Sequence, residues 1–174
     1  MKKVNLISLI SVSLLMLFFN ISLVSQTLDS YGTLERPKDI GNSDFDGFKN
    51  NSFDTYFNTC KIEANLKEIE GNVEKYNADK ENIDANALKS DLKSLTDINT
   101  SINGLREDLK TLKDKSENMA SKAKTLTPKT KSLKAVQNTK KSTEAINQAK
   151  SKMPVIAQTN AELIKSVKGL LGEN

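Results

Sequence analysis

The chain has 174 residues, 37% hydrophobic and 28% charged, with 26 Lys and Arg against 22 Asp and Glu. This length is enough for one domain, and the absence of histidine removes the commonest general base and zinc ligand. Since Gly-rich phosphate loops and Cys-x-x-Cys pairs are also absent, we expect a non-enzymatic protein without cofactor or metal. Only seven Gly and three Pro favour an all-α fold of a few long helices.

Residues 1–26 have the order of charge and hydropathy typical of a secretory signal peptide. Lys2 and Lys3 precede an apolar run, and small or polar residues follow it up to Gln26. We therefore expect an exported protein, periplasmic or secreted. The alternative is an uncleaved anchor, because residues 4–24 are about long enough to cross a bilayer.

Residues 27–42 form the next unit. They contain Gly32, Pro37 and Gly41 and show no sustained period, which predicts an extended N-terminal segment. Its apolar residues are expected to fold back over the helices; they are Leu28, Tyr31, Leu34 and Ile40.

A first helix is predicted over residues 43–80, with Ser43 as its N-cap and acidic residues in its first turn. Residues 42–47 also resemble the opening of a calcium-binding loop. The twelfth position of such a loop requires a bidentate Glu, but here it is Phe53. Helix capping is therefore the preferred interpretation.

Aromatic residues are concentrated at the start of this helix. We interpret them as core, with an apolar groove for a client peptide or lipid tail as the alternative; they are Phe45, Phe48, Phe53, Tyr56 and Phe57. Cys60 is the only cysteine, so it cannot form an internal disulfide. A core position is preferred over a cross-link to a second copy.

A second helix is predicted over residues 84–126, with Asp84 as its N-cap. Its apolar positions follow steps of three and four residues, the pattern of a coiled-coil helix; they include Leu95, Ile98, Ile102, Leu105, Leu109, Leu112, Met119, Ala123 and Leu126. Charged residues such as Asp108 are assigned to a solvated face.

A third helix is predicted over residues 128–171, with Thr127 as its cap. Its first part has only a thin stripe that includes Leu133, Val136 and Thr139, whereas a regular seam runs from Ile146 to Leu170. Pro154 lies within that seam and is expected to kink the helix.

These elements predict an elongated antiparallel three-helix bundle, or coiled coil, over residues 43–174. Residues 27–117 carry 13 basic and 19 acidic residues, whereas residues 118–174 carry 11 Lys and three Glu. A basic third helix beside two acidic ones gives complementary rims. A monomer is therefore favoured over a homo-oligomer.

The basic third helix also contains the candidate binding surface. It could contact an anionic membrane or polysaccharide, while nucleic acid is disfavoured because arginine and aromatic residues are absent there; its residues are Lys129, Lys131, Lys134, Lys140, Lys141, Lys150 and Lys152. We predict an exported scaffold or chaperone-like protein that acts by binding another protein. The alternative is a membrane-active amphipathic protein that uses these lysines.

Overall fold

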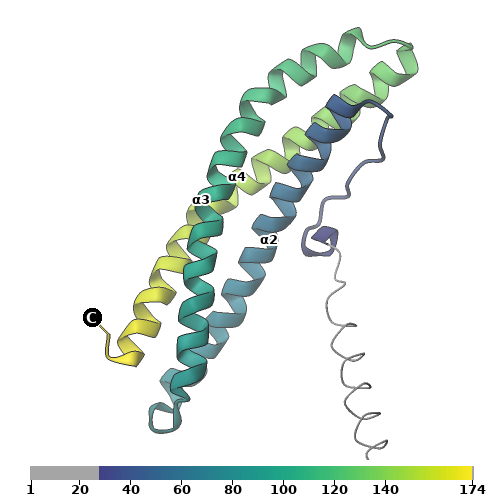
Figure 1. Ribbon diagram of the computed structural model, residues 1–174. Helices are drawn as coiled ribbons and strands as arrows, with labels where there is room; N and C mark the ends of the chain where they lie inside the picture. Colours follow the sequence, from purple (N-terminus) through teal and green to yellow (C-terminus); the bar gives the residue numbers. More distant parts are fainter. Residues whose placement is uncertain (1–27, 174) are drawn as a thin grey trace, which may run out of the picture.

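The computed structural model describes residues 28–173, and in this part of the chain it contains helices and no strand (Figure 1). The all-α prediction is therefore confirmed, with three long helices. The elements are η1 (Leu28–Tyr31), α2 (Ser43–Ala78), η2 (Lys80–Asn82), α3 (Ala85–Thr125) and α4 (Lys129–Leu171). The predicted signal peptide lies outside the described residues. Among those described, none of the helices is both long and apolar enough to cross a membrane.

Helix α2 starts at Ser43, the predicted first residue, but its N-cap differs by one residue from the prediction. Its N-cap is Asn42, not Ser43, because the Asn42 side chain accepts a hydrogen bond from the Asp44 amide at 3.1 Å. The Asp46 carboxylate accepts from the amides of Ile40 and Asn42, at 2.9 and 3.0 Å. Two of the side chains that resembled a calcium loop thus hold the backbone at the start of the helix.

The other helix ends are formed by different capping residues. Asp84 caps α3 as predicted, accepting from the Asn86 amide at 2.8 Å. Thr127 does not cap α4, because Pro128 occupies the cap position. The helix therefore begins one residue later than predicted, at Lys129. At its far end, Gly172 adopts a left-handed conformation with φ of 74°.

The three helices lie side by side, with α2 and α4 running in one direction and α3 in the other (Figure 1). Helix α4 contacts both α2 and α3 extensively, whereas α2 and α3 contact each other much less. The turn between α3 and α4 projects beyond the start of α2 (Figure 1). The molecule is therefore elongated, with α4 as its central element.

The core follows the predicted seams over most of the chain. All seam positions of α3 named above are buried except Leu126, which is half-buried. In α4 the seam residues before and after Pro154, Met153 and Ile156, are both buried. The helix continues through this proline, so the seam keeps its phase there. The kink and the coiled-coil geometry stay predictions.

The first part of α4 corrects the predicted stripe. Leu133 and Val136 are exposed, by 58% and 38%. Thr139 of that stripe is buried, and the other buried positions before Ile146 are small or polar; they are Ala135, Asn138, Ser142 and Ala145. Because this part of α4 lies level with the ring-rich start of α2 (Figure 1), bulky residues on one helix require small ones on the other.

The N-terminal segment covers the aromatic residues of α2. Leu28, Tyr31 and Leu34 pack against the core and Ile40 is buried. The Tyr56 hydroxyl accepts a hydrogen bond from the Thr33 amide at 3.1 Å. All five aromatic side chains of the predicted cluster are at most 6% exposed; they are Phe45, Phe48, Phe53, Tyr56 and Phe57. They therefore form core in this structure and do not offer an open apolar groove.

Candidate functional site

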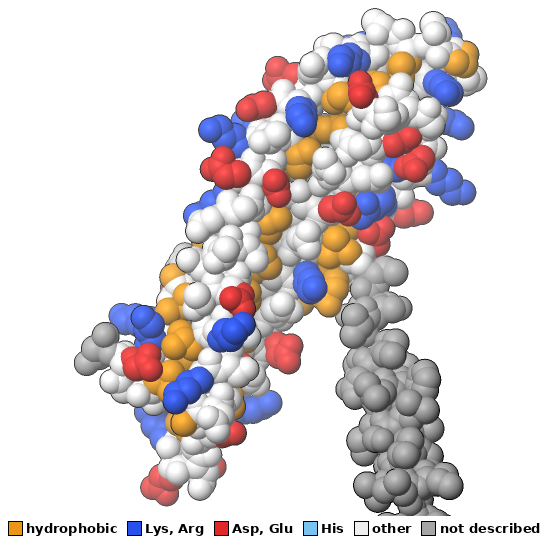
Figure 2. All heavy atoms as spheres, viewed as in Figure 1, with side chains coloured by type: hydrophobic (Ala, Val, Ile, Leu, Met, Phe, Trp, Pro, Cys, Tyr) orange, Lys and Arg blue, Asp and Glu red, His pale blue; other side chains and the backbone are white. Residues whose placement is uncertain are grey.

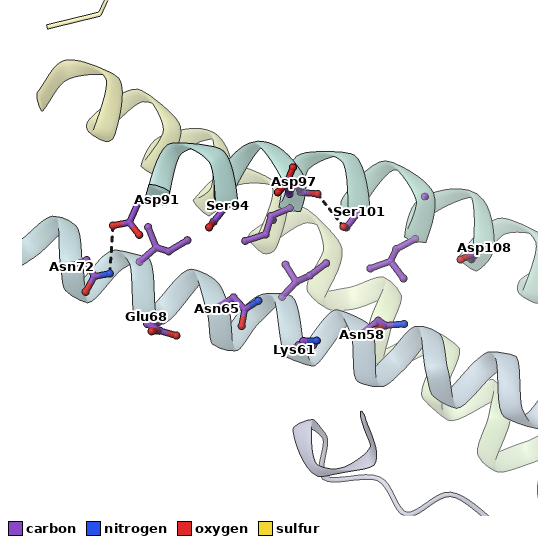
Figure 3. A pocket seen from close by; sticks show the side chains of 15 residues that line it. Asn58, Lys61, Asn65, Glu68, Asn72, Asp91, Ser94, Asp97, Ser101 and Asp108 are labelled. Atoms are coloured by element: carbon purple, nitrogen blue, oxygen red, sulfur yellow. Dashed lines mark hydrogen bonds between the residues drawn. The ribbon is translucent and has the colours of Figure 1, made fainter. Parts of the chain in front are cut away.

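A groove of about 700 Å³ lies between α2 and α3 (Figure 3). It exists because these two helices contact each other less than either contacts α4. Its floor is apolar and consists of Ile62, Ile69, Ile98 and Leu105. Each floor residue keeps 6–7% exposure, whereas Leu95 and Ile102 of the same α3 seam have 0% and 1%. The floor is thus the margin of the core that the third helix leaves incompletely covered.

Polar residues of α2 form one wall of the groove. They recur at steps of three, four, three and four residues, the period that places side chains on one stripe of a helix; they are Asn58, Lys61, Asn65, Glu68 and Asn72. The stripe lies beside the apolar seam of α2. It covers about 21 Å of helix at 1.5 Å per residue.

The opposite wall repeats this spacing on α3 with shorter side chains. Its residues are Ser94, Asp97, Ser101, Gly104 and Asp108. A Cβ atom added to Gly104 would meet no other atom within 4 Å, so there is open space beside this glycine. Two stripes with helical period, facing each other over an apolar floor, give the groove the length and shape of a further helix.

One end of the groove is closed by hydrogen bonds between the helices. The Asp91 carboxylate of α3 accepts from the Asn72 amide nitrogen at 3.4 Å (Figure 3). It also accepts from the Tyr76 hydroxyl at 3.2 Å. Partial burial and the neighbouring Asp91 raise the pKa of Tyr76, so its hydroxyl keeps the proton that it donates. These contacts join α2 to α3 near the turn that connects them.

The charge of the groove is predominantly negative. Its lining contains four carboxylates and a single ammonium group; they are Glu68, Asp91, Asp97, Asp108 and Lys61. The Lys61 ammonium lies 5.9 Å from the centre of the Tyr31 ring, in the N-terminal segment. Among the described residues, Glu68 and Asp108 form no ion pair. The groove therefore favours a positively charged occupant.

The seven lysines of the predicted surface lie in two different environments in the structure. The lysines at 129, 131, 134, 140, 141 and 150 are exposed. Lys152 is instead half-buried and donates to Glu63 of α2 at 2.6 Å. This hydrogen bond raises the pKa of Lys152, and its charge contributes to the contact between α2 and α4. Lys152 therefore does not belong to a free anionic-partner surface, which is a correction.

The sequence contained a signal for the groove that our prediction did not use. Asp108 is exposed, as its assignment to a solvated face predicts, and it also lines the α3 wall. The polar residues of both walls follow the same three-and-four spacing as the apolar seams. A search for a second periodic stripe would have found them, but only the structure places the two stripes opposite each other. Comparisons with protein families, curated proteins and solved structures find no match to this chain.

Proposed function

We propose that this protein is an exported, non-enzymatic binding protein, and that the α2–α3 groove receives a basic amphipathic helix of a protein partner. The observation that carries the proposal is the pair of facing polar stripes over an apolar floor. Such a groove accepts the apolar face of a helix on its floor and charged side chains at its rims. A helix of about 15 residues matches the length of the walls.

The partner's charge is argued from the walls. With Glu68, Asp97 and Asp108 on the rims, a partner with Lys or Arg on its flanks is attracted and an acidic helix is repelled. The short side chains of α3 leave room for the longer side chains of such a partner. A scaffold or chaperone-like role follows, because the protein would hold a segment of another protein without altering it.

The first test uses a defined probe. A synthetic amphipathic peptide of about 20 residues, with leucines on one face and lysines on the other, is titrated with the full chain. Binding is followed by fluorescence anisotropy. An otherwise identical peptide with glutamates in place of lysines is the counterpart. We expect the basic peptide to bind and the acidic one to bind at least roughly tenfold more weakly.

Variants locate the binding in the groove. Gly104→Phe places a ring in the open space beside α3 and is expected to abolish binding, whereas Gly104→Ala keeps it. The double variant Glu68→Gln with Asp108→Asn should weaken binding by roughly fivefold at low salt, from two exposed charge contacts. Glu74→Gln with Glu107→Gln changes the net charge equally outside the groove and should have no such effect.

A photo-crosslinking residue at Asn65 then identifies the natural partner in expressing cells, with the same residue at exposed Glu74 as the control. We expect an adduct from Asn65 that is lost with Gly104→Phe. Equal binding of the basic and acidic peptides, or unchanged binding by Gly104→Phe, would contradict the proposal.

A further inference from the structure

A second surface lies at the end of the molecule where α3 turns into α4, and it is independent of the groove. We define the hairpin tip as residues 118–143, which comprise the end of α3, the turn and the start of α4. The tip contains seven lysines and no Asp, Glu or Arg; the lysines are Lys122, Lys124, Lys129, Lys131, Lys134, Lys140 and Lys141. All seven are exposed.

Few of these charges are neutralised within the fold. Among the described residues, only Lys122 reaches a carboxylate, that of Asp44 at 4.0 Å, and both side chains are more than half exposed. The tip projects beyond the start of α2 (Figure 1), and its other six lysines form no ion pair with the described residues. The complementary rims predicted from the sequence therefore do not account for them.

The tip also exposes apolar side chains. The described residues contain three exposed large hydrophobic side chains, and two of them, Leu133 and Val136, belong to the tip. With Lys129 and Lys140 they follow steps of four, three and four residues, which places all four on one stripe of α4. In Figure 2 the upper end of the molecule shows patches of orange with blue side chains beside them and some red ones.

An apolar groove continues from this stripe. It has a volume of about 880 Å³, and its lining includes Val136 and Thr139 between Lys124 and Lys140, with Glu144 just beyond the tip. The Thr139 hydroxyl has no hydrogen-bond partner among the residues that the structure describes. Aliphatic surface flanked by lysines, on a tip that itself contains no Asp or Glu, is an arrangement suited to the boundary between lipid headgroups and acyl chains.

We propose that the hairpin tip docks onto an anionic lipid bilayer, with its lysines among the headgroups and Leu133 and Val136 at the acyl boundary. The exposed aliphatic residues favour lipid over a polysaccharide, because an anionic polysaccharide would be bound through charge alone. The absence of arginine and aromatic residues from the tip disfavours nucleic acid. Docking uses the folded hairpin and does not require the helices to separate.

The readout has to come from the tip, since the apolar residues 4–24 at the start of the chain can themselves insert into lipid. Thr130→Cys in a Cys60→Ala background places one environment-sensitive fluorophore at the exposed start of α4. Full-length protein is titrated with vesicles of 70% phosphatidylcholine and 30% phosphatidylglycerol, and with pure phosphatidylcholine. We expect a blue shift with the anionic vesicles only, and its loss at high salt.

Three variants test the assigned residues. Lys129→Glu, Lys131→Glu and Lys134→Glu together should weaken vesicle binding by about 100-fold, and Leu133→Ser alone by roughly tenfold. The control reverses three exposed lysines at the opposite end of the bundle, giving the same net charge, and should leave binding unchanged; its residues are Lys80, Lys89 and Lys168. Circular dichroism verifies that each variant is folded.

Two results would overturn the inference. One is a blue shift that is equal for the tip variant and the control variant. The other is tight binding of the wild type to heparin or double-stranded DNA without any response to anionic vesicles, which would assign the tip to a soluble polyanion. Neither result tests the α2–α3 groove, which is a different surface. The two proposals can fail independently, because Gly104→Phe alters the groove and leaves the tip unchanged.

Discussion

Cys60 lies in α2, buried in the core near Tyr56 and Lys152. Burial raises the pKa of its thiol above the ordinary value of 9.0, although a hydrogen bond with Tyr56 and the charge of Lys152 act in the opposite direction. The fold therefore favours the neutral thiol. This is the behaviour of a core residue and not of a reactive nucleophile.

A pH prediction follows for Cys60. The thiol has a higher pKa in the folded than in the unfolded protein, so its contribution to stability is fully present below pH 9 and is lost as the pH rises through the folded pKa. Between pH 8 and 10.5, the wild type should lose more stability than Cys60→Ala. Urea unfolding of both proteins across this range measures the difference, and parallel losses would contradict it.

Arg36 shows how one side chain joins the N-terminal segment to α2. Burial opposes its charge, but hydrogen bonds to Asp29 and Asp54 outweigh this and raise the pKa of Arg36. The guanidinium donates to both carboxylates at 2.6 Å and lies 5.5 Å from the centre of the Phe57 ring. A fixed planar fork suits this combination of two carboxylates and a ring face better than lysine would.

At the scale of elements, the N-terminal segment depends on a close approach at Gly32. A Cβ atom there would lie 2.8 Å from two atoms of the Phe57 ring, and nearer still to Tyr56. The glycine is therefore needed for space, since its φ lies outside the left-handed region. Any larger residue must push the segment away from the aromatic side chains.

Gly32→Ala is expected to destabilise the protein by about 1–3 kcal/mol, the usual cost of overpacking. Gly47→Ala is the matched control, because a Cβ there meets nothing within 4 Å and α2 gains a better helix former. Urea unfolding monitored by circular dichroism compares the two. Equal unfolding midpoints for the two variants would contradict this prediction, because they would mean that the N-terminal segment can move away from the aromatic side chains without loss of stability.

At the scale of the whole molecule, stability comes from seams that no helix can bury alone. Leu95 is fully buried, so Leu95→Ala should cost about 2–5 kcal/mol. Leu133 is 58% exposed, so Leu133→Ala should change stability by no more than about 0.5 kcal/mol. Chemical unfolding of the two variants tests this directly, and similar losses would mean that the hairpin tip is packed in solution.

The residues that stabilise the fold differ from those that form the two proposed binding surfaces. The core side chains of α3 and α4 are needed for the fold, whereas Leu133, Val136 and the groove walls contribute little to it. We therefore expect Gly104→Phe and Leu133→Ser to lose binding while remaining folded. This makes the two proposed interactions separable by mutation.

The sequence by itself determined the helices and most of the core. Apolar residues at steps of three and four predicted the seams of α3 and α4, and Asp84 marked the start of α3, because these signals act within one helix. The start of α4 was not predictable in this way. Its buried residues are small and polar, and only their position beside the aromatic start of α2 explains their burial.

The candidate sites depended on tertiary structure to a greater extent. The sequence identified the lysines, but it could not show that Lys152 contacts Glu63 or that most of the others lie on a projecting tip. It contained both polar stripes without indicating that they face each other. Periodicity gives the direction in which each residue points from its own helix. The distance between α2 and α3 depends instead on how both helices pack on α4. That distance leaves the groove open.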